Sequence, residues 1–158
     1  MIESIFEIRA AKNEADIAIA ADLFREYQTW LDVDLCFQDF EAELADVAGM
    51  YAQPRGIIYI ASVGDEDLGV GALRPISDTR SEMKRVYVRE SARGLGIGKR
   101  IIDLLIARAS EVGYTSMVLD TLPKLETAQA IYKSLGFKEI PPYYKNSLPG
   151  VVYFEKTL

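Results

Sequence analysis

The chain has 158 residues, of which 49% are hydrophobic, with one cysteine, no histidine and a formal net charge of −6. This length and apolar share suit one domain over residues 1–158 with a full core, and no apolar run is long enough to cross a bilayer. The missing histidine excludes His-based triads and most zinc sites, so we expect no metal, and the acidic balance argues against a nucleic-acid partner.

The first residues, Met1 to Ser4, offer no cationic segment ahead of an apolar stretch, so we expect no signal peptide. The single cysteine, Cys36, cannot form an internal disulfide. Both features are typical of a protein in a reducing compartment, so we expect a cytoplasmic protein without a membrane partner.

Strand and helix patterns alternate in the first part of the chain. A strand is predicted over 6–10, and a helix follows in which apolar residues recur at helical spacing over 17–31. Asn13 or Asp16 could cap this helix. Apolar residues at similar spacing over 37–51 predict a second helix.

The rest of the chain predicts a sheet with helices on its faces. The strands are expected at 57–63, 68–73, 82–89 and 116–122, with two short ones between 137 and 158. The helices are expected at 97–109 and 126–135. This order of elements indicates an α/β (α+β) fold around a mixed sheet.

The most informative segment is Arg93-Gly94-Leu95-Gly96-Ile97-Gly98-Lys99-Arg100, which joins a predicted strand to a helix start. A glycine-rich turn at a helix start presents free N–H groups at the positive end of the helix dipole, which suits a phosphate. Residues 80–100 hold 7 bases and 2 acids, whereas residues 1–54 hold 12 acids and 3 bases, so the segment lies in a basic island. The spacing excludes a Walker A loop, because Arg100 follows Gly98-Lys99, and a dinucleotide fingerprint, because Lys99 replaces its third glycine.

The remaining pattern, Arg-x-x-Gly-x-Gly between a strand and a helix, resembles the acetyl-CoA pyrophosphate loop of the GCN5-related N-acetyltransferases, the GNAT superfamily. A second segment, Ala128-x-x-Ile131-Tyr132-x-x-x-Gly136-Phe137, resembles the Ala-x-x-Leu-Tyr-x-x-x-Gly-Phe motif of that family. The order of elements is similar as well. The resemblance implies the GNAT fold, in which about four helices flank a mostly antiparallel sheet of about seven strands.

The resemblance also implies that acetyl-CoA is the cofactor. The N–H groups of residues 95–99 would hold the pyrophosphate, and Arg93 and Arg100 would add charge-assisted bonds. The backbone of Val86-Tyr87-Val88 would pair with the pantetheine arm and polarise the thioester. Tyr132 would lie near the sulfur and act as general acid. The chain departs from the family at Leu125, where many members carry Asn; Lys124 or Thr127 could substitute for it.

Three candidates remain open for the group that accepts the amine proton. Glu82 lies on the strand before the loop, at an offset comparable to that of the strand glutamate in some family members, and an apolar wall could raise its pKa. It alternates with Lys84, Val86 and Val88 on one strand face. A salt bridge with Lys84, Arg80 or Arg85 is the alternative role for Glu82. Asp120, at the end of the next strand, and an ordered water are the other two candidates.

The resemblance places the acceptor site among the first helices, the hairpin and the last strands. These elements supply Trp30, Phe37, Arg74, Tyr143, Tyr144 and Asn146. Arg74 could hold a substrate carboxylate, and the acidic first third could attract a cationic amine. The aromatic residues could instead belong to the core or to a homodimer interface.

The leading interpretation is an acyltransferase, namely an acetyl-CoA-dependent N-acetyltransferase. It would acetylate the primary amine of a small molecule, peptide or protein by direct attack. Cys36 lies far from the cofactor motifs in the sequence, so we expect no covalent acetyl-cysteine. The alternatives are a non-catalytic acyl-CoA-binding sensor or interaction module of the same fold and, third, a nucleotide phosphate-binding protein.

Overall fold

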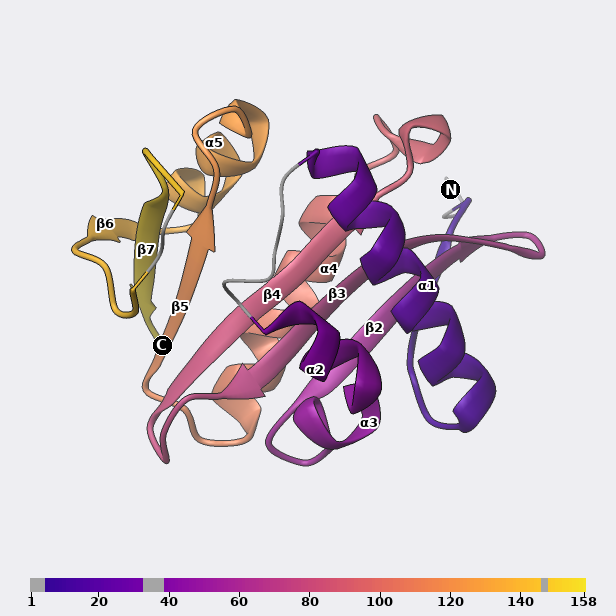
Figure 1. Cartoon of the computed structure of the whole chain (residues 1–158), viewed down its shortest axis with the longest axis horizontal. Helices are drawn as coiled ribbons and strands as arrows, with labels where there is room; N and C mark the ends of the chain where they lie inside the picture. The colour runs from indigo at the N-terminus through magenta and orange to yellow at the C-terminus, as the bar shows by residue number, and fades with distance from the viewer. Residues whose placement is uncertain (1–4, 33–38, 146–147) are drawn as a thin grey trace, which may run out of the picture.

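Seven strands form one sheet in the part of the chain that the structure describes (Figure 1). The computed structural model describes residues 5–32, 39–145 and 148–158. In sheet order, the strands are β1 (Glu7–Ala10), β2 (Ile57–Val63), β3 (Glu66–Pro75), β4 (Arg80–Val88), β5 (Ser116–Thr121), β7 (Val152–Thr157) and β6 (Lys138–Ile140). All neighbours are antiparallel except β4 and β5, which are parallel. The mixed, mostly antiparallel sheet predicted from the sequence is therefore confirmed.

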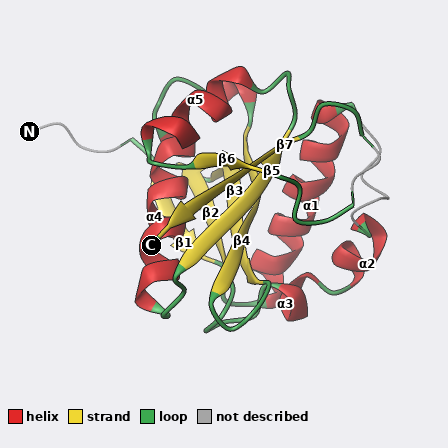
Figure 2. Ribbon diagram, turned by 90° about the vertical axis from the view of Figure 1, so that its left-hand side faces the viewer, coloured by secondary structure: helices red, strands yellow, loops and turns green. Residues whose placement is uncertain are grey.

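Helices cover both faces of the sheet (Figure 2). They are α1 (Glu14–Leu31), α2 (Phe40–Ala45) and α3 (Val47–Met50) on one face, and α4 (Ile97–Glu111) and α5 (Glu126–Ser134) on the other, with a 3₁₀ turn, η2 (Glu90–Ala92), before α4. Phe24 of α1 packs in one core cluster with Val70, and Leu105 of α4 packs in another with Leu73. Strand side chains alternate between the faces, so neighbouring positions supply both clusters. In the three described stretches of chain, every helix falls short of the length and hydrophobicity that crossing a bilayer requires.

The start of α1 follows from a local cap. Asn13 has an extended backbone, with φ of −129° and ψ of 175°, and its side chain accepts a hydrogen bond from the N–H of Asp16 at 2.9 Å. This bond satisfies one of the free N–H groups at the helix start. Of the two candidate caps, Asn13 has this role. The helix ends at Leu31 because Asp32 adopts the left-handed region, with φ of 55°.

The single helix predicted over 37–51 is wrong in its extent. The described residues form two short helices, α2 and α3, on either side of Asp46. The Asp46 side chain accepts a hydrogen bond from the N–H of Gly49 at 3.2 Å, and its own backbone is not helical. An aspartate that caps a new helix in this way ends the previous one. Phe37 and Cys36 lie outside the described residues.

A β-bulge in β4 changes which side chains share a face. Ala72 of β3 pairs with Lys84, whereas Val70 pairs with Tyr87, so β4 has one residue more than β3 in this stretch. The φ of Arg85 is 59°, which is rare for a residue with a side chain. Ala72 and Val70 belong to the core cluster under α1. Lys84 and Tyr87 therefore lie on the α1 face of the sheet.

The bulge corrects one expectation from the sequence. Val86 and Val88 pack against the core cluster on the α4 side of the sheet. The predicted alternation of Glu82, Lys84, Val86 and Val88 on one face is therefore wrong. The extra residue at Arg85 reverses the alternation, so Lys84 lies on the α1 face whereas Val86 and Val88 lie on the α4 face.

Strands β4 and β5 separate soon after they begin. They pair from Arg80–Ser116 to Glu82–Val118, and beyond that point they diverge (Figure 1). On its other side, β5 pairs with β7 along its whole length, from Ser116 to Thr121. Within the described chain, the β4 edge over 83–88 has no strand partner on the β5 side. The divergence thus leaves a row of backbone polar groups facing the opening.

Candidate active site

A cleft of about 830 Å³ lies between the diverging strands β4 and β5. Its lining comes from 83–88 of β4, 119–121 of β5, the start of α4, the last turns of α1 and the first part of α5. The volume is in the range of pockets that bind small molecules and cofactors. The free N–H and C=O groups of β4 can pair with an extended ligand that itself carries amides.

The glycine-rich loop forms one end of this cleft. Gly94 and Gly96 have φ values of 87° and 85°, which glycine adopts without strain. Gly96 is the N-cap of α4, and no side chain of the described residues caps this helix. None of the N–H groups of 94–99 donates a hydrogen bond to any other described residue. Free N–H groups at the positive end of a helix dipole are the arrangement that suits an anion such as a diphosphate.

Arg93 connects this loop to two other parts of the cleft. Its Nε donates to the carbonyl of Val88 at 3.0 Å, and its guanidinium carbon lies 4.5 Å from the centre of the Trp30 ring. Trp30 in turn stacks on Tyr27, with ring centres 6.2 Å apart, and lies 5.9 Å from Tyr87. Trp30, which was expected in the acceptor site, therefore contacts a residue of the loop.

The other exposed residues of the loop differ in position. Lys99 lines the cleft and forms an ion pair with Asp103 at 3.1 Å. Arg100 and Leu95 are exposed and lie outside the cleft lining. Of the two arginines expected to supply charge, Arg93 lines the cleft and Arg100 does not.

Tyr132 reaches the cleft from α5. The side chain is buried and packs edge-on against Phe137, with ring centres 5.7 Å apart. Burial raises the pKa of the phenol, and nearby Tyr27 and Asp120 raise it further, so the hydroxyl is protonated at neutral pH. Within the described part of the chain the Tyr132 hydroxyl makes no hydrogen bond. It is therefore able to donate a proton to a bound group.

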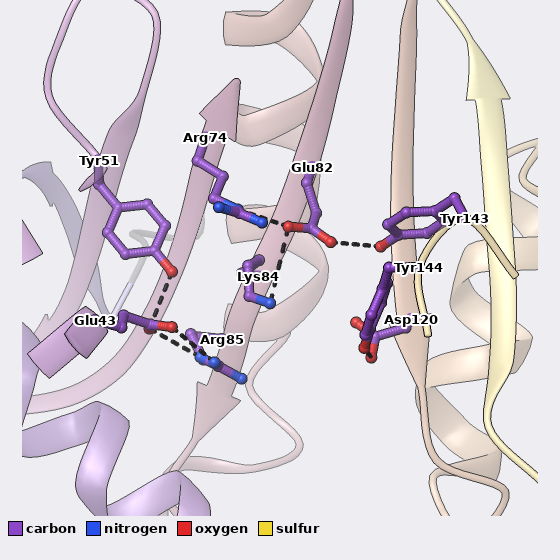
Figure 3. A network of polar contacts seen from close by, with 9 residues as sticks. All are labelled: Glu43, Tyr51, Arg74, Glu82, Lys84, Arg85, Asp120, Tyr143 and Tyr144. Carbon is purple, nitrogen blue, oxygen red and sulfur yellow. Dashed lines mark hydrogen bonds and ion pairs between the residues drawn. The ribbon is translucent and has the colours of Figure 1, made fainter. Parts of the chain in front are cut away.

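Glu82 lies in a buried network that engages both of its carboxylate oxygens (Figure 3). Arg74 Nε donates to one oxygen at 2.7 Å, the Tyr143 hydroxyl donates to the other at 2.5 Å, and Lys84 Nζ lies 3.8 Å from the first. Burial by itself would raise the pKa of Glu82, but the charges of Lys84 and Arg74 and the hydrogen bonds from Tyr143 and Arg74 outweigh it, and the pKa is lowered. The expectation of a raised pKa is therefore wrong. Glu82 is also absent from the cleft lining.

Two side chains of opposite charge line the cleft from the two strands that diverge. Asp120 lies on β5, and it accepts a hydrogen bond from the Tyr144 hydroxyl. Lys84 lies on β4, and its side chain is only 6% exposed. Burial lowers the pKa of Lys84, although Glu82 and Asp120 act in the opposite direction. Reasoning from the sequence indicates Lys84 only as a salt-bridge partner of Glu82. Its position in the cleft depends on the bulge, which the sequence does not show.

Consecutive tyrosines link these two strands from the segment between β6 and β7. Tyr143 donates to Glu82 of β4, and Tyr144 donates to Asp120 of β5 (Figure 3). Their ring centres are 5.3 Å apart, and both pack edge-on against Tyr153, at 5.4 and 5.6 Å. Both tyrosines were expected in the acceptor site from the sequence, which did not indicate their carboxylate partners. Their position keeps both carboxylates oriented at the point where the strands part.

A second buried network holds the bulge. Arg85 donates two hydrogen bonds to Glu43, at 3.0 and 2.7 Å, and the Tyr51 hydroxyl donates to the same carboxylate at 3.0 Å. Burial alone would lower the pKa of Arg85, but the bonds and charge of Glu43 raise it, so the guanidinium stays charged. Since Glu43 comes from α2, this pair ties that helix to β4 beside the cleft. No signal in the sequence pointed to it.

The remaining residues expected in the acceptor site or at the cofactor differ in whether they line the cleft. Arg74 is bonded to Glu82 and lies outside the cleft lining. Asn146 lies outside the described residues. Of the two substitutes considered for the missing Asn, Thr127 lines the cleft, and Lys124 also lines it but donates to the carbonyl of Leu31 at the end of α1.

The fold and this cleft define a class of acyl-group transferases, and comparison with known proteins agrees. The model of the acetyltransferase (GNAT) family matches residues 18–137. An uncharacterised N-acetyltransferase of Schizosaccharomyces pombe is 41% identical to the chain, over 97% of this chain and 95% of that protein. A crystal structure of an acetyltransferase from Streptococcus agalactiae has a TM-score of 0.81 at 23% identity and covers 99% of this chain and 100% of that one.

A GNAT family acetyltransferase from Elizabethkingia anophelis, solved with acetyl-CoA bound, has a TM-score of 0.61 at 17% identity, with 99% of this chain and 100% of that chain covered. The two solved structures share the fold with this protein. Together with the family match and the fungal relative, they lead to a plain conclusion: this chain belongs to the GNAT acetyltransferase family.

Proposed function

We propose that this protein is an acetyl-CoA-dependent N-acetyltransferase that acts on a primary amine of a small molecule or peptide. One observation carries the proposal: an unpaired strand edge leads along the cleft to a helix start whose N–H groups are unbonded within the described residues. This arrangement fits a ligand with an amide-bearing arm that ends in a diphosphate. The names of related proteins and the acetyl-CoA bound to one structural neighbour support the same ligand.

The residues of the chain divide the binding of that ligand between them. The N–H groups of 94–99 would hold the diphosphate, with Lys99 and Arg93 adjacent, and the backbone over 86–88 would pair with the arm. When bound, acetyl-CoA supplies an acetyl group that is activated as a thioester. Tyr132 holds a proton in the cleft and would give it to the departing sulfur.

The same geometry favours Asp120, directly or through a water, as the group that takes the amine proton. Asp120 lines the cleft, where it accepts a hydrogen bond from Tyr144, whereas Glu82 lies outside the cleft lining. In direct attack, the amine nitrogen forms the new bond to the acetyl carbon and the carbon–sulfur bond breaks. Asp120 receives one proton and Tyr132 gives one, so the protons balance.

The test is a screen of primary amines, including short lysine peptides, with acetyl-CoA. Thiol release is followed by absorbance, and mass spectrometry identifies the acetylated product. We expect stoichiometric thiol release and amine acetylation, with no acetyl group left on the protein. If coenzyme A binds in calorimetry but no amine is acetylated, the protein is a non-catalytic acyl-CoA sensor and the proposal fails. Preferential binding of ATP over coenzyme A would instead support a nucleotide-binding protein.

A further inference from the structure

We propose that Tyr27 of α1 binds the acceptor amine and makes the protein selective for primary over secondary amines. Its hydroxyl oxygen accepts a hydrogen bond from the N–H group that stays on the nitrogen after acetyl transfer. This inference rests on the proposed acetyltransferase function, and it gives a role on the acceptor side to a residue outside the cofactor motifs.

The first argument is that the Tyr27 ring is held in place on the wall of the cleft. Tyr27 is half-buried and lines the cleft. Its ring centre lies 6.2 Å from that of Trp30, with the ring planes 20° apart, and 5.5 Å from that of Tyr87 on β4. The guanidinium of Arg93 in turn covers Trp30, 4.5 Å from its ring centre. A side chain that its neighbours already fix loses little freedom when its hydroxyl binds a ligand.

The second argument concerns the hydrogen bonding of the Tyr27 hydroxyl. It makes no hydrogen bond within residues 5–32, 39–145 and 148–158. By contrast, the Tyr51 hydroxyl donates to Glu43 at 3.0 Å, and that of Tyr143 donates to Glu82 at 2.5 Å. A phenol that is removed from water usually has a hydrogen-bond partner. An acceptor bound in the cleft would supply this partner for Tyr27.

The third argument is the position of this hydroxyl relative to the groups that move protons. Burial raises the pKa of Tyr27 to about 12; the charge of Arg85 acts against this rise and that of Asp120 adds to it. Tyr27 in turn raises the pKa of Tyr132. Because such interactions weaken with distance, the Tyr27 hydroxyl lies near both Asp120 and Tyr132.

The two phenols enter the cleft from opposite sides. Tyr27 comes from α1 on one face of the sheet, and Tyr132 comes from α5 on the other face (Figure 2). Tyr132 has been assigned to the departing sulfur, so a group on the α1 side is placed for the incoming amine.

The fourth argument comes from the hydrogens of the reacting amine. A neutral primary amine has two N–H groups. In direct attack the nitrogen bonds to the acetyl carbon, one hydrogen passes to Asp120 and the other stays on the amide nitrogen, while the carbon–sulfur bond breaks and Tyr132 protonates the sulfur. The lone pair must face the acetyl carbon, so a hydroxyl beside the nitrogen assists by accepting the N–H that stays. Tyr27 itself neither gains nor loses a proton.

The same balance gives the selectivity. An N-methyl amine passes its one N–H hydrogen to Asp120 and has none left to donate to Tyr27. The hydroxyl would then be covered by the ligand without a hydrogen bond, which costs free energy. A site of this kind discriminates against the ligand that leaves a polar group without a partner.

The experiment compares a primary amine with its N-methyl derivative. The screen for thiol release, with benzylamine, L-alanine and a short lysine peptide among its members, supplies the primary amine that is used best. For the unaltered protein we expect kcat/KM to be at least about tenfold higher for this amine than for its N-methyl form. Tyr27→Phe keeps the ring and removes the hydroxyl. It should lower kcat/KM for the primary amine about fivefold, as expected for one lost hydrogen bond, and change that for the N-methyl amine less than about twofold.

Tyr59→Phe is the matched control. Tyr59 lies on β2 and is also half-buried, and its hydroxyl makes no hydrogen bond to another described residue, but it is absent from the cleft lining. This variant should keep the ratio of the two kcat/KM values. In both variants we expect an unchanged midpoint of thermal unfolding and, in calorimetry, an unchanged affinity for coenzyme A.

These two measurements separate binding of the acceptor from other roles of the hydroxyl. A loss of coenzyme A affinity in Tyr27→Phe would show that Tyr27 binds the cofactor instead, and would overturn the inference. A lowered unfolding midpoint in Tyr27→Phe alone would show that the hydroxyl is bonded within the protein, and would overturn it as well.

The kinetic comparison has its own contrary outcomes. Equal use of the primary amine and its N-methyl form by the unaltered protein would overturn the inference and leave acetyl transfer intact. The same holds if Tyr27→Phe keeps the full preference for the primary amine. Failure of the unaltered protein to acetylate any amine in the screen would instead reject the proposed function itself.

Discussion

The guanidinium carbon of Arg93 lies 4.5 Å from the centre of the Trp30 ring, so the loop before α4 touches the last turn of α1. The sequence assigned these residues to different ligands, Arg93 to the cofactor and Trp30 to the acceptor. The contact also includes the Val88 carbonyl, to which Arg93 Nε donates. We therefore expect a ligand bound at the loop to be sensitive to the position of α1, whose last turns line the cleft.

Arg93→Met should weaken coenzyme A binding by about tenfold, because a charge-assisted bond and a cation–π contact are lost together. Isothermal calorimetry measures this change. Arg100→Met is the matched control, because Arg100 carries the same charge but lies outside the cleft lining. For Arg100→Met we expect coenzyme A affinity to fall by less than about threefold, because salt screens the attraction of an exposed charge. Equal losses in the two variants would contradict the special position of Arg93.

Gly96→Ala should reduce both stability and coenzyme A affinity. The φ of Gly96 is 85°, and a residue with a side chain pays about 1–2 kcal/mol in this left-handed region. The added methyl meets no protein atom within 4 Å, so the loss of affinity would come from the altered loop and from crowding of its ligand. Thermal unfolding and calorimetry measure the two effects.

Gly64→Ala is the control for that experiment. Gly64 lies in the turn between β2 and β3 and has φ of 60°. A Cβ added there would also meet no atom of the described residues within 4 Å. Its substitution should cost a similar unfolding free energy and leave coenzyme A affinity unchanged. A glycine loop that tolerated Gly96→Ala without loss of affinity would not be the diphosphate site.

Tyr132→Phe should lower kcat by about a hundredfold and change KM for acetyl-CoA little, because it removes a general acid and keeps the buried ring. Tyr114→Phe is the comparison, since Tyr114 is also buried but donates its hydroxyl to the Arg55 carbonyl at 2.7 Å and lies outside the cleft lining. That variant should lose about 1 kcal/mol of stability and keep its kcat. Steady-state kinetics with the best amine distinguishes the two; an unchanged kcat in Tyr132→Phe would refute the assigned role.

Glu82 should make stability depend on pH in the acid range. Its pKa in the folded protein is lowered from the ordinary 4.5, so its contribution is complete above that value and is lost as the pH falls through the lower folded pKa. Glu82→Gln should be less stable by about 3 kcal/mol at neutral pH, because Arg74 and Lys84 lose a buried partner. Its unfolding free energy should fall less steeply than that of the unaltered protein below pH 4.5.

Glu155→Gln provides the contrast for the pH experiment. Glu155 pairs with Arg80, and both side chains are 32% exposed. Exposed pairs of this kind contribute up to about 1 kcal/mol. Urea unfolding at a series of pH values should therefore give a curve close to that of the unaltered protein. If the unfolding free energies of Glu82→Gln and of the unaltered protein changed with pH in parallel, the network would not stabilise the Glu82 carboxylate.

Local patterns predicted much of the fold. The strand expected at 57–63 is β2 in the structure, and the helix expected from 97 begins at Ile97, because alternation, helical spacing and glycine turns act over a few residues. The same reasoning found the loop with positive φ at Gly94 and Gly96. It failed over 37–51, where Asp46 caps a new helix and apolar spacing alone does not show the break.

The candidate site was harder to predict from the sequence than the fold, because its contacts join residues that are distant in the chain. The hydrogen bond from Tyr143 to Glu82 spans 61 residues, and that from Arg85 to Glu43 spans 42. The pKa of Glu82, which burial alone would raise, is lowered by the charges of Lys84 and Arg74 together with the hydrogen bonds from Tyr143 and Arg74. The bulge at Arg85 is likewise a property of the pairing between β3 and β4, and it moves every later side chain of β4 to the other face.

The order of residues alone accounts for the strands, for the helix starts and for a glycine turn that suits a phosphate, since each depends on forces within a few neighbouring residues. The folded chain adds the divergence of β4 from β5 and the placement of Lys84 and Asp120 on its two sides. It also adds the network of charges and hydrogen bonds that holds Glu82 ionised and the burial that keeps Tyr132 protonated. These properties depend on which charges and apolar groups meet in space, because desolvation and Coulomb interaction act through distance and burial rather than along the chain.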